Sequence, residues 1–179
     1  MRWLPYLILA YVALGLQIGL SPHIRFHGAT PNLGLLAVIF IAINAPRDAA
    51  MLGAFGIGLV QDLLSAQPPG LYALSYGLVA ALVTAASSAV YREHPLAHLL
   101  LTFIGGLMTM FILLLHGWIR PPGPATVDGK IAIPPVRLAA STLFLGVLYT
   151  TVLAPFLIGG LQRIKRVFAF RPPRRKIRM

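Results

Sequence analysis

Long apolar runs separated by short polar segments dominate the sequence and predict six membrane-spanning helices. A helix that crosses the hydrocarbon core of a bilayer needs about 20 predominantly apolar residues. Proline, glycine and charged residues interrupt the apolar pattern and mark the connections between helices. The predicted spans are residues 3–20, 32–44, 49–66, 71–91, 96–119 and 136–161. The predicted fold class is an all-α polytopic membrane protein, with a six-helix membrane domain over residues 1–162 and a basic tail over residues 163–179.

Two of these runs depart from a standard span. The first resembles a signal peptide, but no small-x-small cleavage site follows it, so we expect an uncleaved helix. The second, over residues 32–44, is short for a span. It crosses the membrane only if the bilayer thins locally or the flanking residues contribute.

Composition agrees with a membrane protein and excludes several other classes. Hydrophobic residues make up 58% of the 179 positions and charged residues only 11%, whereas about a quarter of a soluble domain is charged. Such an apolar chain is not intrinsically disordered. Six spans would use roughly 120 residues, which leaves no room for a separate soluble catalytic domain. Disulfides and thiolate chemistry are excluded because the chain contains no cysteine.

The distribution of basic residues predicts the orientation. If the N-terminus is cytoplasmic, 11 of the 15 lysines and arginines lie on the cytoplasmic side and four, namely Arg25, Arg120, Lys130 and Arg137, lie outside. Cytoplasmic loops of membrane proteins carry such an excess of positive charge. Both termini are therefore predicted to be cytoplasmic.

Eight of the basic residues follow the last span directly. They are Arg163, Lys165, Arg166, Arg171, Arg174, Arg175, Lys176 and Arg178. A polybasic segment in this position is attracted to anionic lipids by about 1 kcal/mol for each basic residue near the surface. Nucleic acid is the alternative partner, but the interleaved Val167, Phe168 and Phe170 favour the membrane interface. We therefore expect contact with anionic lipids and no nucleic-acid binding.

Small residues recur at four-residue spacing on three of the predicted helices. The stripes are Ala50, Ala54, Gly58 and Asp62 on the third helix, Ala73, Gly77, Ala81, Ala85 and Ala89 on the fourth, and Gly15 and Gly19 on the first. Small residues at this spacing allow helix backbones to approach closely in lipid. The stripes therefore indicate either packing within one bundle or a docking face for a membrane partner, and both interpretations stay open.

Asp62 is the one acidic residue deep within an apolar run. A charge at that depth is costly and usually faces a partner or a wet cavity. It could cap backbone N–H groups of the 67–70 turn or of the following helix, or it could pair with a basic residue or His116. A proton relay would need further acidic residues in the spans, and the sequence has none.

Other candidate chemistry is weak. The histidine pairs His23 and His27, and His94 and His98, have four-residue spacing but lie next to or across a proline, so no metal site is predicted. No catalytic triad or phosphate-binding loop is present in the sequence, and neither enzymatic activity nor a cofactor is expected. An Asp128-Gly129 pair between β-forming residues predicts a small hairpin in the last outer loop.

A motif across the second, third and fourth spans resembles a known family. The residues are Pro31-Asn32-Leu33, Pro46-Arg47, the stretch from Gly53 through Phe55 and Gly58 to Asp62-Leu63-Leu64, and Pro69-Gly70-Leu71 followed by Ala73-Leu74. This pattern resembles the MreD family of rod shape-determining membrane proteins. The family positions matched here are Gly53, Phe55, Gly58, Asp62 and Gly70, and the resemblance implies structural or interface roles for them.

The resemblance implies a non-enzymatic subunit of the bacterial cell-elongation machinery in the inner membrane. Its expected partners are an MreC-type bitopic protein, a RodA-type glycosyltransferase with a class B penicillin-binding transpeptidase, and MreB and RodZ in the wider assembly. The family is similar in fold to substrate-binding subunits of energy-coupling-factor vitamin transporters. A transporter subunit is therefore the alternative function, and it needs a polar outer pocket where Asp62, His116, Tyr72 and the outer loops converge.

The predicted orientation can be tested with reporters fused after Met179. A reporter that is active only in the cytoplasm should work there, because the basic residues are concentrated on that side. A reporter that is active only outside the membrane should be silent in the same position. The opposite pattern would show that the orientation is wrong.

Overall fold

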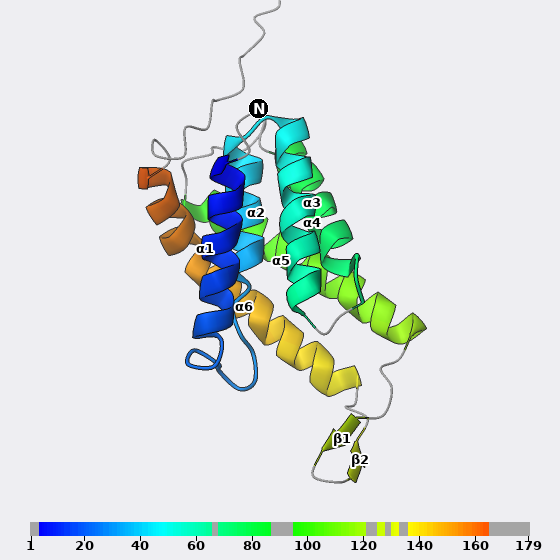
Figure 1. Ribbon diagram of the computed structural model, residues 1–179. Coiled ribbons are helices and arrows are strands. Elements are labelled where there is room, and N and C mark those ends of the chain that lie inside the picture. The colour runs from blue at the N-terminus through cyan, green and yellow to red at the C-terminus, as the bar shows by residue number, and fades with distance from the viewer. Residues whose placement is uncertain are drawn as a thin grey trace, which may run out of the picture.

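The computed structural model describes residues 4–65, 68–86, 95–120, 125–127, 130–132 and 136–164. Six helices and one short hairpin form within this part of the chain, as Figure 1 shows. The helices are α1 (Leu4–Leu20), α2 (Leu33–Asn44), α3 (Arg47–Leu64), α4 (Leu71–Ala86), α5 (Pro95–Ile119) and α6 (Val136–Ile164). The strands are β1 (Ala125–Val127) and β2 (Lys130–Ala132). The helical class of the membrane domain is confirmed.

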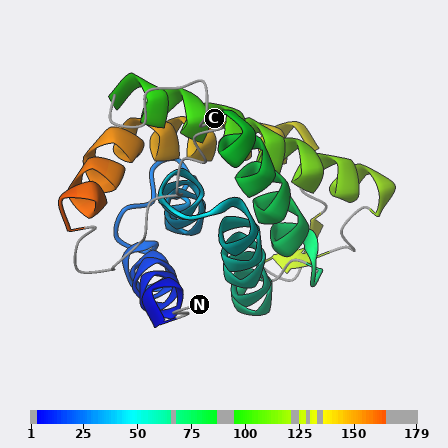
Figure 2. The ribbon, with the colours of Figure 1, turned by 90° about the horizontal axis from the view of Figure 1, so that it is seen from above.

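Helix α2 forms the centre of the bundle. Every residue from Gly34 to Ile43 is buried, and α2 contacts each of the other five helices. Viewed from above, it lies between α1, α3 and the α5–α6 pair (Figure 2). Its 12 residues extend only about 18 Å, less than the roughly 30 Å of a bilayer core. The apolar run over residues 32–44 can be this short because other helices, rather than lipid, surround α2.

Among the residues that the structure describes, two helices are long and apolar enough to cross a membrane by themselves. They are the segments Leu96–Ile119 of α5 and Ala140–Arg163 of α6. Three shorter apolar helical segments accompany them, Tyr6–Leu20, Leu33–Asn44 and Leu71–Ala86. Helix α6 continues to Ile164, three residues past its predicted end, and contains Pro155. Six spans therefore remain a prediction, while the helices themselves match all six predicted starts to within two residues.

Helices α3 and α4 pack most closely, along the predicted stripe of α3. Ala50 and Ala54 are fully buried. A Cβ atom on Gly58 would lie 2.4 Å from the backbone oxygen of Tyr72 and 2.5 Å from Cα of Ala73. At this position the absence of a side chain is what allows the two backbones to meet.

The stripe predicted on α4 is only partly correct. Ala73 is buried, Gly77 is half-buried and Ala85 is exposed, and Ala89 lies outside the described residues. The face that α4 buries instead consists of Ala73, Tyr76, Val79, Ala80 and Val83. Its spacing alternates between three and four residues, because a straight helix has 3.6 residues per turn. A strict four-residue stripe therefore turns away from the neighbouring helix.

Two tight hairpins lie at the end of the bundle opposite to the start of α1. Strands β1 and β2 pair antiparallel with Val127 opposite Lys130, which confirms the predicted hairpin (Figure 1). The second hairpin, between α1 and α2, pairs Phe26 with Ala29. Its two central residues, His27 and Gly28, both have positive φ angles, as a two-residue turn of this kind requires.

The α3–α4 contact predicts different responses from two glycines of the same helix. Replacing Gly58 with alanine should lower stability by about 1–3 kcal/mol, because the new methyl group meets backbone atoms that cannot rotate away. Gly56→Ala is the matched control, since a Cβ there meets nothing within 4 Å, and it should be neutral or slightly stabilising. Thermal unfolding of the purified proteins in detergent measures both. Equal stability of the two variants would contradict this account of the contact.

Candidate functional site

Asp62 caps the beginning of helix α4. Its Oδ2 atom accepts hydrogen bonds from the backbone N–H groups of Gly70 at 2.9 Å and Ala73 at 3.0 Å. Its Oδ1 atom accepts one from the N–H of Tyr72 at 2.8 Å. The side chain is only 3% exposed. The first N–H groups of a helix have no partner within the helix, and a carboxylate there also interacts favourably with the helix dipole.

This geometry agrees with the capping interpretation of Asp62. Both carboxylate oxygens are engaged by backbone N–H groups, and among the described residues no ion pair joins Asp62 to His116. Gly70 has a φ angle of +100°, a conformation that favours glycine. It places the Gly70 N–H within reach of the carboxylate, which gives this family-matched glycine a structural role.

A second capping cluster holds the beginning of the central helix α2. Asn32 accepts a hydrogen bond from the N–H of Leu35 at 2.9 Å, and Gln17 of α1 accepts one from the N–H of Gly34 at 3.0 Å. The hydroxyl of Thr150 on α6 accepts from the N–H of Asn32 at 2.8 Å. Tyr76 of α4 donates its hydroxyl to Oδ1 of Asn32 at 2.7 Å.

Sequence reasoning missed this cluster. Asn32 stands immediately before an apolar run, which is a standard N-cap signal, so one member could have been found. The other three come from helices far away along the chain, and nothing in their local sequence marks them. Only the packing of α1, α4 and α6 around α2 brings them together.

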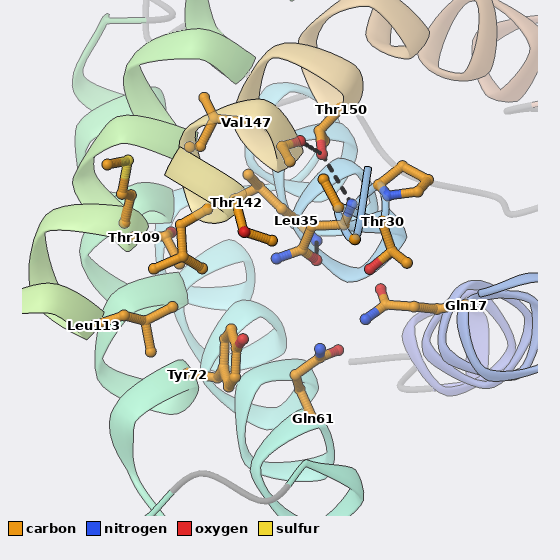
Figure 3. A pocket seen from close by; sticks show the side chains of 18 residues that line it. Gln17, Thr30, Leu35, Gln61, Tyr72, Thr109, Leu113, Thr142, Val147 and Thr150 are labelled. Atoms are coloured by element: carbon orange, nitrogen blue, oxygen red, sulfur yellow. Dashed lines mark hydrogen bonds between the residues drawn. The ribbon is translucent and has the colours of Figure 1, made fainter. Parts of the chain in front are cut away.

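A cavity of about 270 Å³ lies next to this cluster. Its wall includes residues of all six helices and of the connection over residues 28–32 (Figure 3). Tyr72 lines it, as the transporter hypothesis expected, but Asp62 and His116 do not. The prediction that these three residues converge is therefore wrong, because Asp62 faces the α4 backbone and His116 lies farther along α5.

The remaining glycines of the predicted interface fall into two groups. A Cβ on Gly53 would lie 2.9 Å from the ring of Tyr6 on α1, so that position is filled within the bundle. Gly15 and Gly19 are exposed and would meet nothing within 4 Å. Phe55 is half-exposed at 48% and lies on the outer side of α3. The small residues of α3 thus pack internally, while those of α1 face outwards.

Of the predicted lipid-binding tail, the structure describes only the beginning. Arg163 is exposed in the last turn of α6. The other seven basic residues, from Lys165 to Arg178, lie outside the described residues. Among the described residues there is no group of three or more side chains that could hold a metal ion.

The comparison with protein families shows to which family the chain belongs. Residues 1–164 match the family model described as rod shape-determining protein MreD. The chain belongs to the MreD family. The match extends over α1, α5 and α6 as well as the motif region, and so supports a role in determining rod shape as a membrane protein. No curated protein and no solved structure matches the chain.

The Asp62 cap predicts that even a conservative substitution is damaging. Asparagine keeps one acceptor oxygen but replaces the other with an NH₂ group, which would face a backbone N–H. We therefore expect Asp62→Asn to lower stability by about 1–3 kcal/mol and Asp62→Ala by more. Asp48→Asn is the control, because Asp48 is exposed in the first turn of α3. Thermal unfolding in detergent is the measurement, and wild-type stability of Asp62→Asn would contradict the role of the cap.

Proposed function

We propose that this protein is a non-enzymatic scaffold or regulatory subunit of the bacterial cell-elongation machinery. It lies in the inner membrane with six spans and both termini in the cytoplasm. Its direct partner is an MreC-type bitopic protein, and a RodA-type glycosyltransferase, a class B penicillin-binding transpeptidase, MreB and RodZ belong to the wider assembly. Support comes from the family match over residues 1–164 and from the outward-facing glycines of α1.

The described basic residues lie at both ends of the bundle. Exposed Arg47 begins α3 and exposed Arg163 lies in the last turn of α6. Alternating helix directions place these two on the side of the termini. Exposed Arg25 and Arg120 lie at the opposite end, after α1 and α5. Lys130 and the start of α6 with Arg137 belong to that second end as well, so the excess that the positive-inside rule assigns to the cytoplasm comes from Arg2, Arg92 and the basic tail in the sequence.

The outward face of α1 carries the proposal for the partner. Within the described residues α1 contacts α2 and, at fewer positions, α3. Leu9, Ala13 and Leu14 are buried towards the bundle. On the opposite side Tyr11 is 82% exposed, and Gly15 and Gly19 leave open space beyond the backbone. A peripheral helix with this face can receive a second helix without disturbing the bundle.

The physics of lipid favours a single-span helix as the occupant. Apolar helices gain nothing from leaving lipid, so their association depends on close packing and a few polar contacts. A glycine pair at four-residue spacing allows two backbones to approach closely, which a leucine-bearing face would prevent. The Gly15–Gly19 face is therefore proposed as the contact for the membrane-spanning helix of the MreC-type partner.

Cysteine crosslinking tests this face directly, because the chain contains no cysteine of its own. Single cysteines at Gly15 and Gly19 should form disulfides with cysteines in the partner's span. A cysteine at Gly160, an exposed glycine of α6 with equally open surroundings, should not. Gly15→Leu with Gly19→Leu should reduce co-purification of the partner at least tenfold and make rod-shaped cells round, whereas Gly160→Leu should do neither.

Two results would contradict the proposal at different levels. Equal capture from Gly160 and from the α1 positions would place the partner interface elsewhere. Rods of normal width after clean deletion of the gene from a rod-shaped host would reject the function itself.

A further inference from the structure

The cavity beside the α2 cap is lined by residues of all six helices. It lies where α1, α3 and α5 end and where α2, α4 and α6 begin, under the connection over residues 28–32. Its volume of about 270 Å³ equals that of about nine water molecules at roughly 30 Å³ each. Small-molecule sites begin at about 300 Å³, so this cavity lies just below that range and would take only a compact ligand.

The cavity wall is polar but uncharged. Amide groups come from Gln17, Asn32 and Gln61, and hydroxyl groups come from Thr30, Tyr72 and Thr142, among others. None of the described residues that line it is acidic, basic or a histidine. A charged ligand would lose its hydration without gaining a counter-ion, which is costly. The wall therefore suits a neutral molecule that both donates and accepts hydrogen bonds.

Gln61 is the group that points most directly to a ligand. The side chain is 7% exposed, and its Oε1 atom has no hydrogen-bond partner among the described residues. A buried amide oxygen left without a partner is destabilising, so the Gln61 Oε1 atom is an acceptor that a ligand could satisfy. In Figure 3 its side chain projects towards the space between Tyr72 and Gln17.

Gly34 makes room for the Gln61 amide. A Cβ atom at position 34 would lie 2.9 Å from Oε1 of Gln61 and 3.2 Å from the hydroxyl of Tyr76. The Gly34 N–H meanwhile donates to the amide oxygen of Gln17, which leaves the NH₂ group of Gln17 as its remaining donor. The two glutamines thus offer donor and acceptor groups next to each other in the cavity wall (Figure 3).

We propose that this cavity binds an uncharged ligand rich in hydroxyl or amide groups, with Gln61 as a residue that determines specificity. The ligand is either a soluble molecule from the outer side or the neutral headgroup of a lipid. An apolar hollow of about 370 Å³, lined by Phe26, Leu145, Leu148, Tyr149 and Val152, shares Ala29 with the cavity. This hollow would accommodate an acyl chain of the lipid. The proposal does not depend on the partner interface of α1.

Two neutral probes distinguish the sources in the purified full-length protein. N-acetylglucosamine carries one amide and several hydroxyl groups and represents the soluble ligand. Monoglucosyldiacylglycerol, added to phosphatidylcholine nanodiscs, represents the lipid headgroup. A saturable rise of the unfolding temperature, on the order of 5 °C at 100 times the dissociation constant, and a one-to-one adduct in native mass spectrometry are expected with one of them. A response to the sugar in detergent identifies a soluble source, and a response to the glycolipid alone identifies a lipid.

Variants connect the binding to the cavity. Gln61→Met keeps the length of the side chain but removes the amide, and should weaken binding at least tenfold. Tyr72→Phe removes one lining hydroxyl and should weaken it several-fold, which keeps the test valid if Gln61→Met fails to fold. Gln162→Met is the matched control, because Gln162 contacts His98 at the other end of the bundle. The proposal is overturned if neither probe binds at millimolar concentration or if the cavity variants bind as tightly as wild type.

Discussion

Helix starts inside a lipid bilayer need hydrogen-bond partners for their first backbone N–H groups, and the architecture of this protein depends on that constraint. Water is absent from the bilayer core, so the protein must supply those partners itself. Asp62 of α3 supplies them for α4. Asn32, Gln17 and Thr150 supply them for α2. Each cap fixes one helix relative to another, and together they position the half of the bundle in which α2 and α4 begin.

The α3 cap and the α3 small-residue stripe act together. Asp62 reaches the N–H groups of Tyr72 and Ala73 because Gly58, one turn earlier, brings the α4 backbone close. The same stripe continues through Ala54 and Ala50, which are fully buried. The family-matched glycine and aspartate therefore describe one helix–helix contact within the bundle, and the proposed partner surface on α1 is separate from it.

Capping α2 from several helices also creates the cavity. Long polar side chains from α1, α3, α4 and α6 converge on one small volume, and they do not fill it as apolar side chains would. The caps use the oxygens of Gln17 and Asn32, while Gln61 takes no part in them. A membrane protein of this family can thus contain a polar chamber in the same part of the bundle that holds its central helix in place.

The sequence alone determined the helical class, the approximate position of each helix, the β1–β2 hairpin and the family, because hydropathy and turn signals are local. It also restricted Asp62 to a few roles, since a lone acid in an apolar run needs a partner. Tertiary structure decided that this partner is the α4 backbone, that α2 is central, that Tyr76 and Thr150 meet at Asn32 and that Gln17 meets Gly34. It also decided which glycines face outwards. These outcomes depend on which face each helix turns towards its neighbours, and no local pattern of residues determines that.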